Sequence, residues 1–356
     1  MKKFFLKFFL LLPLSVIIIG TNYYTDPANL FSNSKIENKI SKLIIAHKNF
    51  SGIDSFDERI MQKNIINSFE ESPKIISLGS SRIMQIESNL FSDNTFFNHF
   101  VSGASLEDFI AIMGMYFDKG IKPEIVIIGL DPWLLNKNNG QTRWISLKEE
   151  YNNGLLRLGG KAKFTFNFPG WNKWSQLISL AYFQESFTYL IKRKKKMLET
   201  TDKPNETSSV IRFDGSRGLS KIERERTSEE VSKMANEYAS EEPVYSLGDF
   251  NELDQELKTN FNLFILFLVG QNVKPIFVLA PYHPKAYKKI IKKYAVVAEA
   301  EAFYKKYAFD NGIDLVGSYN PDISNTDCSL FYDGMHLKVD FYRTILPDLI
   351  LKNLKK

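Results

Sequence analysis

Short, almost uninterrupted apolar runs recur along the chain, and segments with helical spacing of apolar residues separate them. The clearest runs are residues 74–78 (KIISL), 124–130 (EIVIIGL) and 274–280 (KPIFVLA), and shorter ones lie at residues 95–100 and 312–316. A strand that is buried on both faces has this pattern, and strands that alternate with helices form a mostly parallel sheet. The sequence therefore predicts a three-layer α/β/α domain with five strands.

Small and polar residues follow four of these runs. They are residues 79–81 (GSS), 102–103 (SG), 131–133 (DPW) and 281–283 (PYH). In open parallel sheets, ligands bind outside the carboxyl ends of the strands. We therefore expect the functional residues among these four segments.

The N-terminal segment predicts a membrane anchor. Three lysines precede an uncharged stretch at residues 8–24, and a bilayer core needs about 20 apolar helical residues. Positive charge before such a stretch predicts a cytoplasmic N-terminus and an extracytoplasmic main domain, as in a single-pass protein of the cell (inner) membrane. The alternative is a cleaved signal peptide, but Ile18 does not fit the small-residue cleavage site that this would need.

Composition excludes several classes of function. The 46 basic and 41 acidic residues leave a net charge of +5, which is too mild to indicate nucleic-acid binding. The single cysteine, Cys328, and the four histidines favour neither a disulfide framework nor a metal centre, so we predict no metal and no cofactor. The basic run at residues 192–196 (KRKKK) is typical of a solvated helix end, and contact with an anionic surface is the alternative.

The chain divides into an anchor at residues 1–25, a helical connector at residues 26–72 and a main domain at residues 73–356. Within the main domain, residues of about 135–250 interrupt the alternation of strands and helices. We interpret this stretch as a helical insertion over the ligand edge of the sheet, acting as a lid, a docking surface or both.

Three short motifs carry residues that nucleophilic catalysis uses. Ser81 stands where a strand runs into a helix start, and a hydroxyl there can act as a nucleophile if a base reaches it. Asp333 stands three residues before His336, so its carboxylate can orient the imidazole. Gly103 lies between a strand and a predicted helix start, so its N–H group can serve an oxyanion hole. Each pattern taken alone is also typical of an ordinary turn or loop.

The order of these motifs resembles the SGNH (GDSL-type) hydrolase superfamily. Gly-x-Ser lies at residues 79–81, Asn-x-x-x-Ser-Gly at 98–103, Gly-x-Asp at 129–131 and Asp-x-x-His at 333–336. The match runs from about residue 74 to the C-terminus, excluding the insertion. The resemblance implies a flavodoxin-like sheet.

The resemblance also implies roles for individual residues. Ser81 is the nucleophile, His336 the general base and Asp333 its orienting partner, with oxyanion-hole N–H groups from Ser81 and Gly103. Asp131 departs from the pattern, because the superfamily usually offers an asparagine side-chain donor there and an ionised carboxylate opposes an oxyanion. The candidates for substrate contact are Arg82, Asn98, Trp133 and His283. The alternative for Arg82 is a salt bridge within the protein, and the alternative for His283 is a structural role in its loop.

A narrower resemblance is to membrane-anchored SGNH-like proteins of cell-surface polymer O-acylation, including the D-alanyl transfer protein. It rests on the anchor, on residues 24–27 (YTDP) and on the Pro-Trp pair after the third strand. It implies an extracytoplasmic enzyme that passes an acyl group through acyl-Ser81 to a polysaccharide, or the corresponding esterase, together with a multispanning membrane acyltransferase as partner. The alternative is an inactive domain that binds glycan or scaffolds such an acyltransferase.

Overall fold

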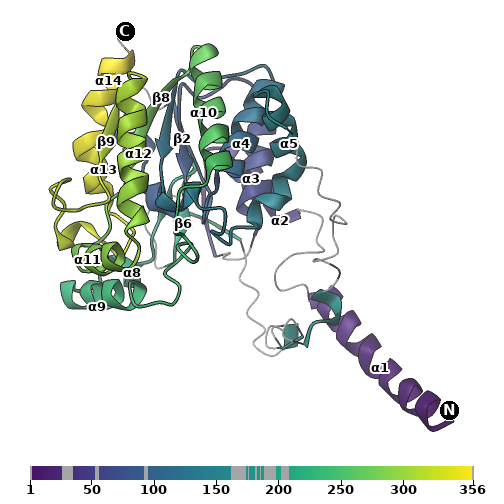
Figure 1. Cartoon of the computed structure of the whole chain (residues 1–356). Coiled ribbons are helices and arrows are strands. Elements are labelled where there is room, and N and C mark those ends of the chain that lie inside the picture. Colours follow the sequence, from purple (N-terminus) through teal and green to yellow (C-terminus); the bar gives the residue numbers. More distant parts are fainter. Residues whose placement is uncertain are drawn as a thin grey trace.

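The computed structural model describes residues 2–25, 35–52, 56–91, 95–161 and 208–354, together with short pieces between residues 174 and 201 (Figure 1). The pieces are residue 174 and residues 176–180, 183–184, 186–187 and 198–201. The predicted basic run at residues 192–196 lies outside the described residues.

A five-stranded parallel sheet forms the centre of the main domain. Its strands lie in the order β3 (Phe96–Phe100), β2 (Ile75–Gly79), β4 (Ile125–Gly129), β8 (Lys274–Leu279) and β9 (Leu315–Gly317). Every residue of β2, β3 and β4 is buried, so both faces of the sheet are covered. The predicted α/β class and the five parallel strands are confirmed.

The strand order places the ends of β2 and β4 at the topological switch point of the sheet. Counted along the chain, the order across the sheet is 2-1-3-4-5, so the direction of winding reverses between β2 and β4. Ligands of such sheets bind at this switch point, outside the carboxyl ends of the strands. Ser81 follows β2 directly, and Asp131 follows β4.

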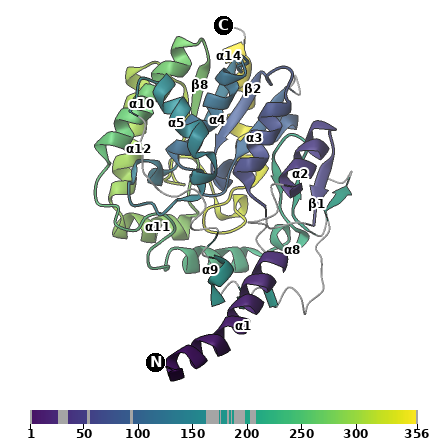
Figure 2. The ribbon, with the colours of Figure 1, turned by 90° about the vertical axis from the view of Figure 1, so that its right-hand side faces the viewer.

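Helices surround the sheet. One of them, α3 (Glu58–Ser68), lies in the predicted connector. Those described in the main domain are α4 (Leu106–Asp118), α5 (Lys148–Arg157), α8 (Lys221–Arg224), α9 (Ser228–Tyr238), α10 (Gln255–Gly270), α11 (Pro284–Lys293), α12 (Val296–Asp310), α13 (Val339–Ile345) and α14 (Pro347–Leu354). Helix α4 packs against α3, α5 and α10 (Figure 2). It begins where the sequence places a capping box: the backbone N–H of Ser105 donates to the Asp108 carboxylate at 2.9 Å.

A second, smaller sheet joins the predicted connector to the predicted insertion. Antiparallel strands lie in the order β5 (Glu199–Thr201), β1 (Asn49–Ser51), β6 (Val210–Ile211) and β7 (Arg217–Gly218). The connector is therefore not wholly helical, since β1 follows α2 (Lys35–Ile45), and the insertion contributes three strands beside its helices. Strands of two or three residues are too short to show an alternating pattern, so the sequence did not indicate them.

The predicted transmembrane helix is wrong. Helix α1 (Lys2–Thr25) forms, but among the described helices none is long and apolar enough to cross a membrane. The apolar part of α1, residues 8–20, lies between three lysines and the polar residues 21–25. At 1.5 Å per residue it is about 20 Å long, whereas a bilayer core is about 30 Å thick.

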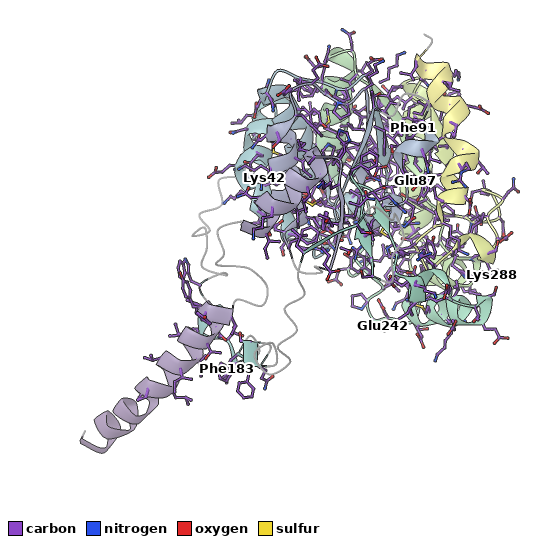
Figure 3. The ribbon with its side chains drawn as sticks, turned by 180° about the vertical axis from the view of Figure 1, so that it is seen from behind. Lys42, Glu87, Phe91, Phe183, Glu242 and Lys288 are labelled. Atoms are coloured by element: carbon purple, nitrogen blue, oxygen red, sulfur yellow. The ribbon has the colours of Figure 1, made fainter. Side chains whose placement is uncertain are left out.

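Helix α1 extends away from the main domain and contacts a short helix of the insertion, η5 (Gln176–Ile178) (Figure 1). The side-chain amide of Asn22 donates to the carbonyl oxygens of Leu177 at 3.0 Å and Ser179 at 3.2 Å. Phe183 lies beside α1 (Figure 3). The first helix and part of the insertion thus lie together, apart from the central sheet.

Candidate active site

Ser81 begins a single turn of 3-10 helix, η1 (Ser81–Ile83), immediately after β2. The preceding Ser80 caps this turn, because its hydroxyl accepts a hydrogen bond from the backbone N–H of Arg82 at 3.2 Å. The turn folds tightly against the sheet: a Cβ at Gly79 would lie 2.6 Å from Cδ1 of Ile83, and a Cβ at Gly129 would lie 2.5 Å from its Cγ2. Glycine at the ends of β2 and β4 therefore lets the turn that carries Ser81 sit directly on the two strands.

The loop at residues 333–336, near the C-terminus, brings an imidazole to Ser81. Nε2 of His336 lies 2.9 Å from Oγ of Ser81, although 255 positions separate the two residues in the chain. Nδ1 of His336 lies 2.7 Å from a carboxylate oxygen of Asp333. The side chains of His336 and Asp333 are 23% and 22% exposed, so solvent or a substrate can reach them. The structure thus brings together the three residues that the sequence pattern singled out.

Hydrogen bonds within the loop fix the position of the Asp333 carboxylate. One of its oxygens accepts the backbone N–H groups of Met335 and His336, both at 2.9 Å, while the other faces the imidazole. Burial alone raises the pKa of Asp333, but His336 and the backbone N–H groups outweigh it and hold the pKa at about 2. The carboxylate is therefore ionised at neutral pH and orients the imidazole.

Gly103 lies in the segment that follows β3, beside the segment that follows β2 and carries Ser81. The N–H of Val101 donates to the carbonyl of Gly79 at 3.0 Å, so residues 79–81 and 101–103 leave the sheet side by side. Gly103 has a φ of +58°, a conformation that favours glycine. This places Gly103 on the same edge as Ser81, as expected for a candidate oxyanion-hole residue.

The carboxylate of Asp131 is not exposed beside Ser81. It is buried and forms an ion pair with Arg82, whose Nη1 lies 3.2 Å away. Burial raises the pKa of Asp131, and Arg82 and the hydroxyl of Ser80 oppose that rise. The arginine neutralises the negative charge that would otherwise oppose an oxyanion at Ser81.

Arg82 is enclosed on every side. Its guanidinium lies 4.0 Å from the ring centre of Tyr282 and 5.8 Å from that of Tyr319, and it donates to the carbonyl of Ala280. The hydroxyl of Tyr342 donates to its backbone carbonyl. Arg82 therefore joins the ends of β2, β4 and β8 beneath Ser81, and this placement does not fit the predicted contact with substrate.

The other three predicted substrate contacts are also buried. Asn98 donates from its amide to the carbonyls of residues 83 and 86, at 3.0 and 2.9 Å, and so supports the turn after Ser81. Trp133 donates from its indole to the carbonyl of Ala104 at 3.0 Å. His283 caps α11, with Nδ1 accepting the N–H of Lys285 at 3.1 Å, and burial lowers its pKa. These residues hold the strand ends in place and are not open to a ligand.

Comparison with known proteins gives a family. A family model described as "Protein of unknown function (DUF1574)" matches residues 4–354. The chain belongs to the DUF1574 family. No curated protein matches the chain.

Among solved structures, this DUF1574 chain is similar to a "putative acylhydrolase" from Bacteroides fragilis NCTC 9343. The likeness covers 82% of this chain and 92% of that chain, with 11% sequence identity and a TM-score of 0.37.

Two charged residues that sequence reasoning missed hold the loop of Gly103 in the DUF1574 chain. Glu58 accepts the hydroxyl of Ser102 at 2.9 Å, and Arg59 forms a buried ion pair with Asp108 at 2.7 Å. Arg59 also donates towards the carbonyls of Ser102 and Gly103 at 3.4 and 3.5 Å. Both residues begin α3, far from this loop in sequence, and no local pattern connects them with it.

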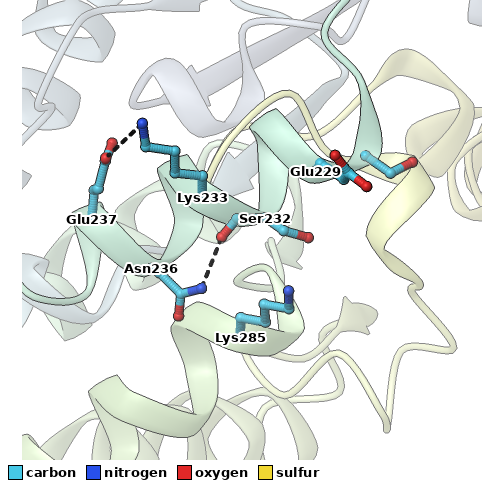
Figure 4. A pocket seen from close by; sticks show the side chains of 7 residues that line it. Glu229, Ser232, Lys233, Asn236, Glu237 and Lys285 are labelled. Carbon is cyan, nitrogen blue, oxygen red and sulfur yellow. Dashed lines mark hydrogen bonds and ion pairs between the residues drawn. The ribbon is translucent and has the colours of Figure 1, made fainter.

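An open groove of about 540 Å³ lies between α9 and the start of α11 (Figure 4). Two of its polar side chains are bonded within α9: the amide of Asn236 donates to the backbone carbonyl of Ser232 at 3.1 Å, and Lys233 lies 3.9 Å from Glu237. None of Ser81, Asp333 and His336 lines it. Among the described residues, no group of three or more histidine, cysteine or acidic residues is arranged to hold a metal ion.

Proposed function

We propose that this DUF1574 protein transfers acyl groups through Ser81. The contact of 2.9 Å between Ser81 Oγ and His336 Nε2 is the single observation that carries the proposal. The ionised Asp333 accepts the Nδ1–H of His336, which leaves Nε2 as the acceptor that faces the serine. This is the arrangement of an activated serine nucleophile.

The chemistry follows from these positions. His336 takes the hydroxyl proton of Ser81 as Oγ attacks the acyl carbonyl of an ester. The tetrahedral intermediate then collapses, and His336 gives the proton to the departing alcohol, which leaves acyl-Ser81. A second hydroxyl compound loses its proton to His336, attacks the acyl group and returns Ser81 to its starting state. The N–H groups of Ser81 and Gly103 are the candidate donors to the oxyanion.

The acceptor decides between transfer and hydrolysis. A sugar hydroxyl gives O-acylation, and water gives an esterase. The resemblance to SGNH-like proteins of polymer O-acylation supports a cell-surface polysaccharide as acceptor and a multispanning acyltransferase as the source of the acyl group. With the transmembrane helix overturned, the extracytoplasmic location and these partners are supported only by what remains of that resemblance, namely residues 24–27 and the Pro-Trp pair, and they stay predictions.

A fluorophosphonate probe tests the proposal. We expect it to label the full wild-type chain and to spare Ser81→Ala, with slow labelling of His336→Ala because the base is missing. Ser232→Ala, on α9, is the matched control and should label like the wild type. Absence of labelling in a wild-type chain that melts cooperatively would refute the proposal and favour the non-catalytic scaffold.

Acceptor choice needs a second measurement. The chain is acylated with p-nitrophenyl acetate, and the release of acetate is compared with the formation of acetylated product after oligosaccharides are added. Mass spectrometry of the oligosaccharides then separates transfer from hydrolysis. Hydrolysis that oligosaccharides do not divert would assign an esterase.

A further inference from the structure

Arg143 is an exposed arginine held in place by neutral partners. It begins the short helix η4 (Arg143–Leu147), and its Nη2 donates to the side-chain oxygen of Gln141 at 3.1 Å and to the hydroxyl of Tyr245 at 3.0 Å. Tyr245 in turn packs edge-on against the buried Trp133, with ring centres 5.7 Å apart. The guanidinium is therefore oriented before any ligand arrives.

The guanidinium lies directly on the backbone of Gly103. A Cβ at Gly103 would be 2.5 Å from Nη2 of Arg143 and 2.5 Å from the side-chain oxygen of Gln141, and it would also collide with the hydroxyl of Tyr245. Since residues 101–103 leave the sheet beside residues 79–81, Arg143 lies next to the edge that carries Ser81. It occupies the side of the site formed by the end of β3.

Among the residues that the structure describes, no acidic side chain neutralises the charge of Arg143. Arg59 and Arg82, which also hold this edge of the sheet, are buried, and each is paired with an aspartate. Within the described part of the chain, Arg143 forms no ion pair, and its hydrogen-bonding partners are an amide and a phenol. An oriented, unneutralised guanidinium with further N–H groups is suited to a carboxylate or phosphate oxygen pair.

We propose that Arg143 binds a negatively charged group of the substrate beside the acyl carbonyl. The proposal deepens the proposed function and rests on it: the ester that reacts with Ser81 is anionic, in its acyl part or in its alcohol part. The anion lies next to Gly103, where Arg143 holds it with charge-assisted hydrogen bonds.

Three esters test which part carries the charge. They are p-nitrophenyl acetate, which is neutral, mono-p-nitrophenyl glutarate, which is anionic in the acyl part, and 4-acetoxybenzoate, which is anionic in the alcohol part. A charge-assisted hydrogen bond predicts that Arg143→Gln lowers the ratio of kcat/KM for one anionic ester over the neutral ester by about 10-fold to 100-fold. Arg157→Gln is the control, since this exposed arginine lies on α5 and pairs with Asp118, and it should leave the ratios unchanged.

Binding gives a readout that does not need turnover. Glutarate should raise the melting temperature of the wild-type chain more than neutral glutaramide does, and Arg143→Gln should remove this difference while Arg157→Gln retains it. Equal stabilisation of wild type and Arg143→Gln by glutarate, or unchanged ester ratios in Arg143→Gln, overturns the proposal. A chain that binds glutarate through Arg143 but hydrolyses none of the esters would contradict the proposed function and leave the anion site standing.

Discussion

For the substitution Asp131→Asn, the sequence pattern and the structure predict opposite effects on activity. The substitution introduces the asparagine that the SGNH superfamily usually has at this position, so the pattern alone predicts a better oxyanion donor and higher activity. The structure predicts the opposite, because Asp131 is the only carboxylate that the described residues pair with the buried Arg82. Removing that charge leaves a guanidinium buried beneath Ser81 without a counter-ion.

The cost can be worked from the burial of the pair. Breaking a buried ion pair by removing one partner costs about 3–5 kcal/mol. Arg82 keeps the carbonyl of Ala280 and the face of Tyr282, and an asparagine oxygen can still accept one hydrogen bond, so we take the lower end, about 3 kcal/mol. For a chain of 356 residues, the entropy of unfolding at Tm is about 0.7 kcal/mol/K, which makes the fall in Tm about 4 °C.

Two assays check this reasoning. Thermal unfolding followed by circular dichroism gives the change in Tm, and p-nitrophenyl acetate hydrolysis gives the change in activity. Asp340→Asn is the matched control: its ion pair with Arg343 is more than half exposed, with side chains 57% and 52% exposed, and its loss should move Tm by less than about 1 °C. If Asp131→Asn melts with the wild type and is more active, the account of Arg82 and Asp131 as a pair that holds the site is wrong.

Three further substitutions test the site. Asp333→Asn should lower kcat by about 10³-fold to 10⁴-fold in a steady-state esterase assay. It should also cost about 2 kcal/mol of stability at pH 7, because the folded-state pKa of Asp333, about 2, lies below the ordinary 3.8. Urea titrations should show this difference in stability vanishing as the pH falls from about 4 through 2. Gly79→Ala should destabilise by about 1–3 kcal/mol in urea unfolding, since its Cβ collides with Ile83, and an unchanged midpoint would contradict the tight packing of that turn. Asp108→Asn leaves Arg59 buried and unpaired, so we expect about 3–5 kcal/mol of destabilisation and slower fluorophosphonate labelling of Ser81. Unaltered labelling would show that the loop of Gly103 does not affect the reactivity of Ser81.

The central sheet could be predicted because its signal is local. The apolar runs at residues 75–79 and 125–129 are buried throughout, so almost every side chain in them had to be apolar. Parallel strands place their carboxyl ends at one edge, and this rule predicts that the turn at residues 79–81 lies there. Residues 333–336 do not directly follow a strand, since β9 ends at Gly317, so the expectation that His336 reaches Ser81 rested on the resemblance to the SGNH order of motifs.

Burial of individual polar residues could not be predicted in the same way. Arg82 and His283 come just after strands, as a ligand-binding residue does, and Asn98 lies within β3. Only the packing of the strand ends against one another shows that these side chains are buried. Arg143 gave no signal either, since its position on Gly103 depends on how residues 132–147 fold back over the sheet edge. Such placements arise from contacts between distant segments, which a single sequence does not display.

The aspartate at position 131, where the SGNH pattern has asparagine, makes physical sense only together with Arg82. A buried ion pair often adds little to stability, because the cost of removing both charges from water offsets their attraction. Its effect here is positional. Arg82 follows Ser81 directly, Asp131 lies just after β4, and Ala280 lies just after β8, so one guanidinium connects the ends of β4 and β8 to the turn that carries the nucleophile after β2. The carboxylate that departs from the superfamily pattern therefore supports the position of the nucleophilic turn instead of contributing a donor to the oxyanion, and the N–H groups of Ser81 and Gly103 remain as the candidates for that task.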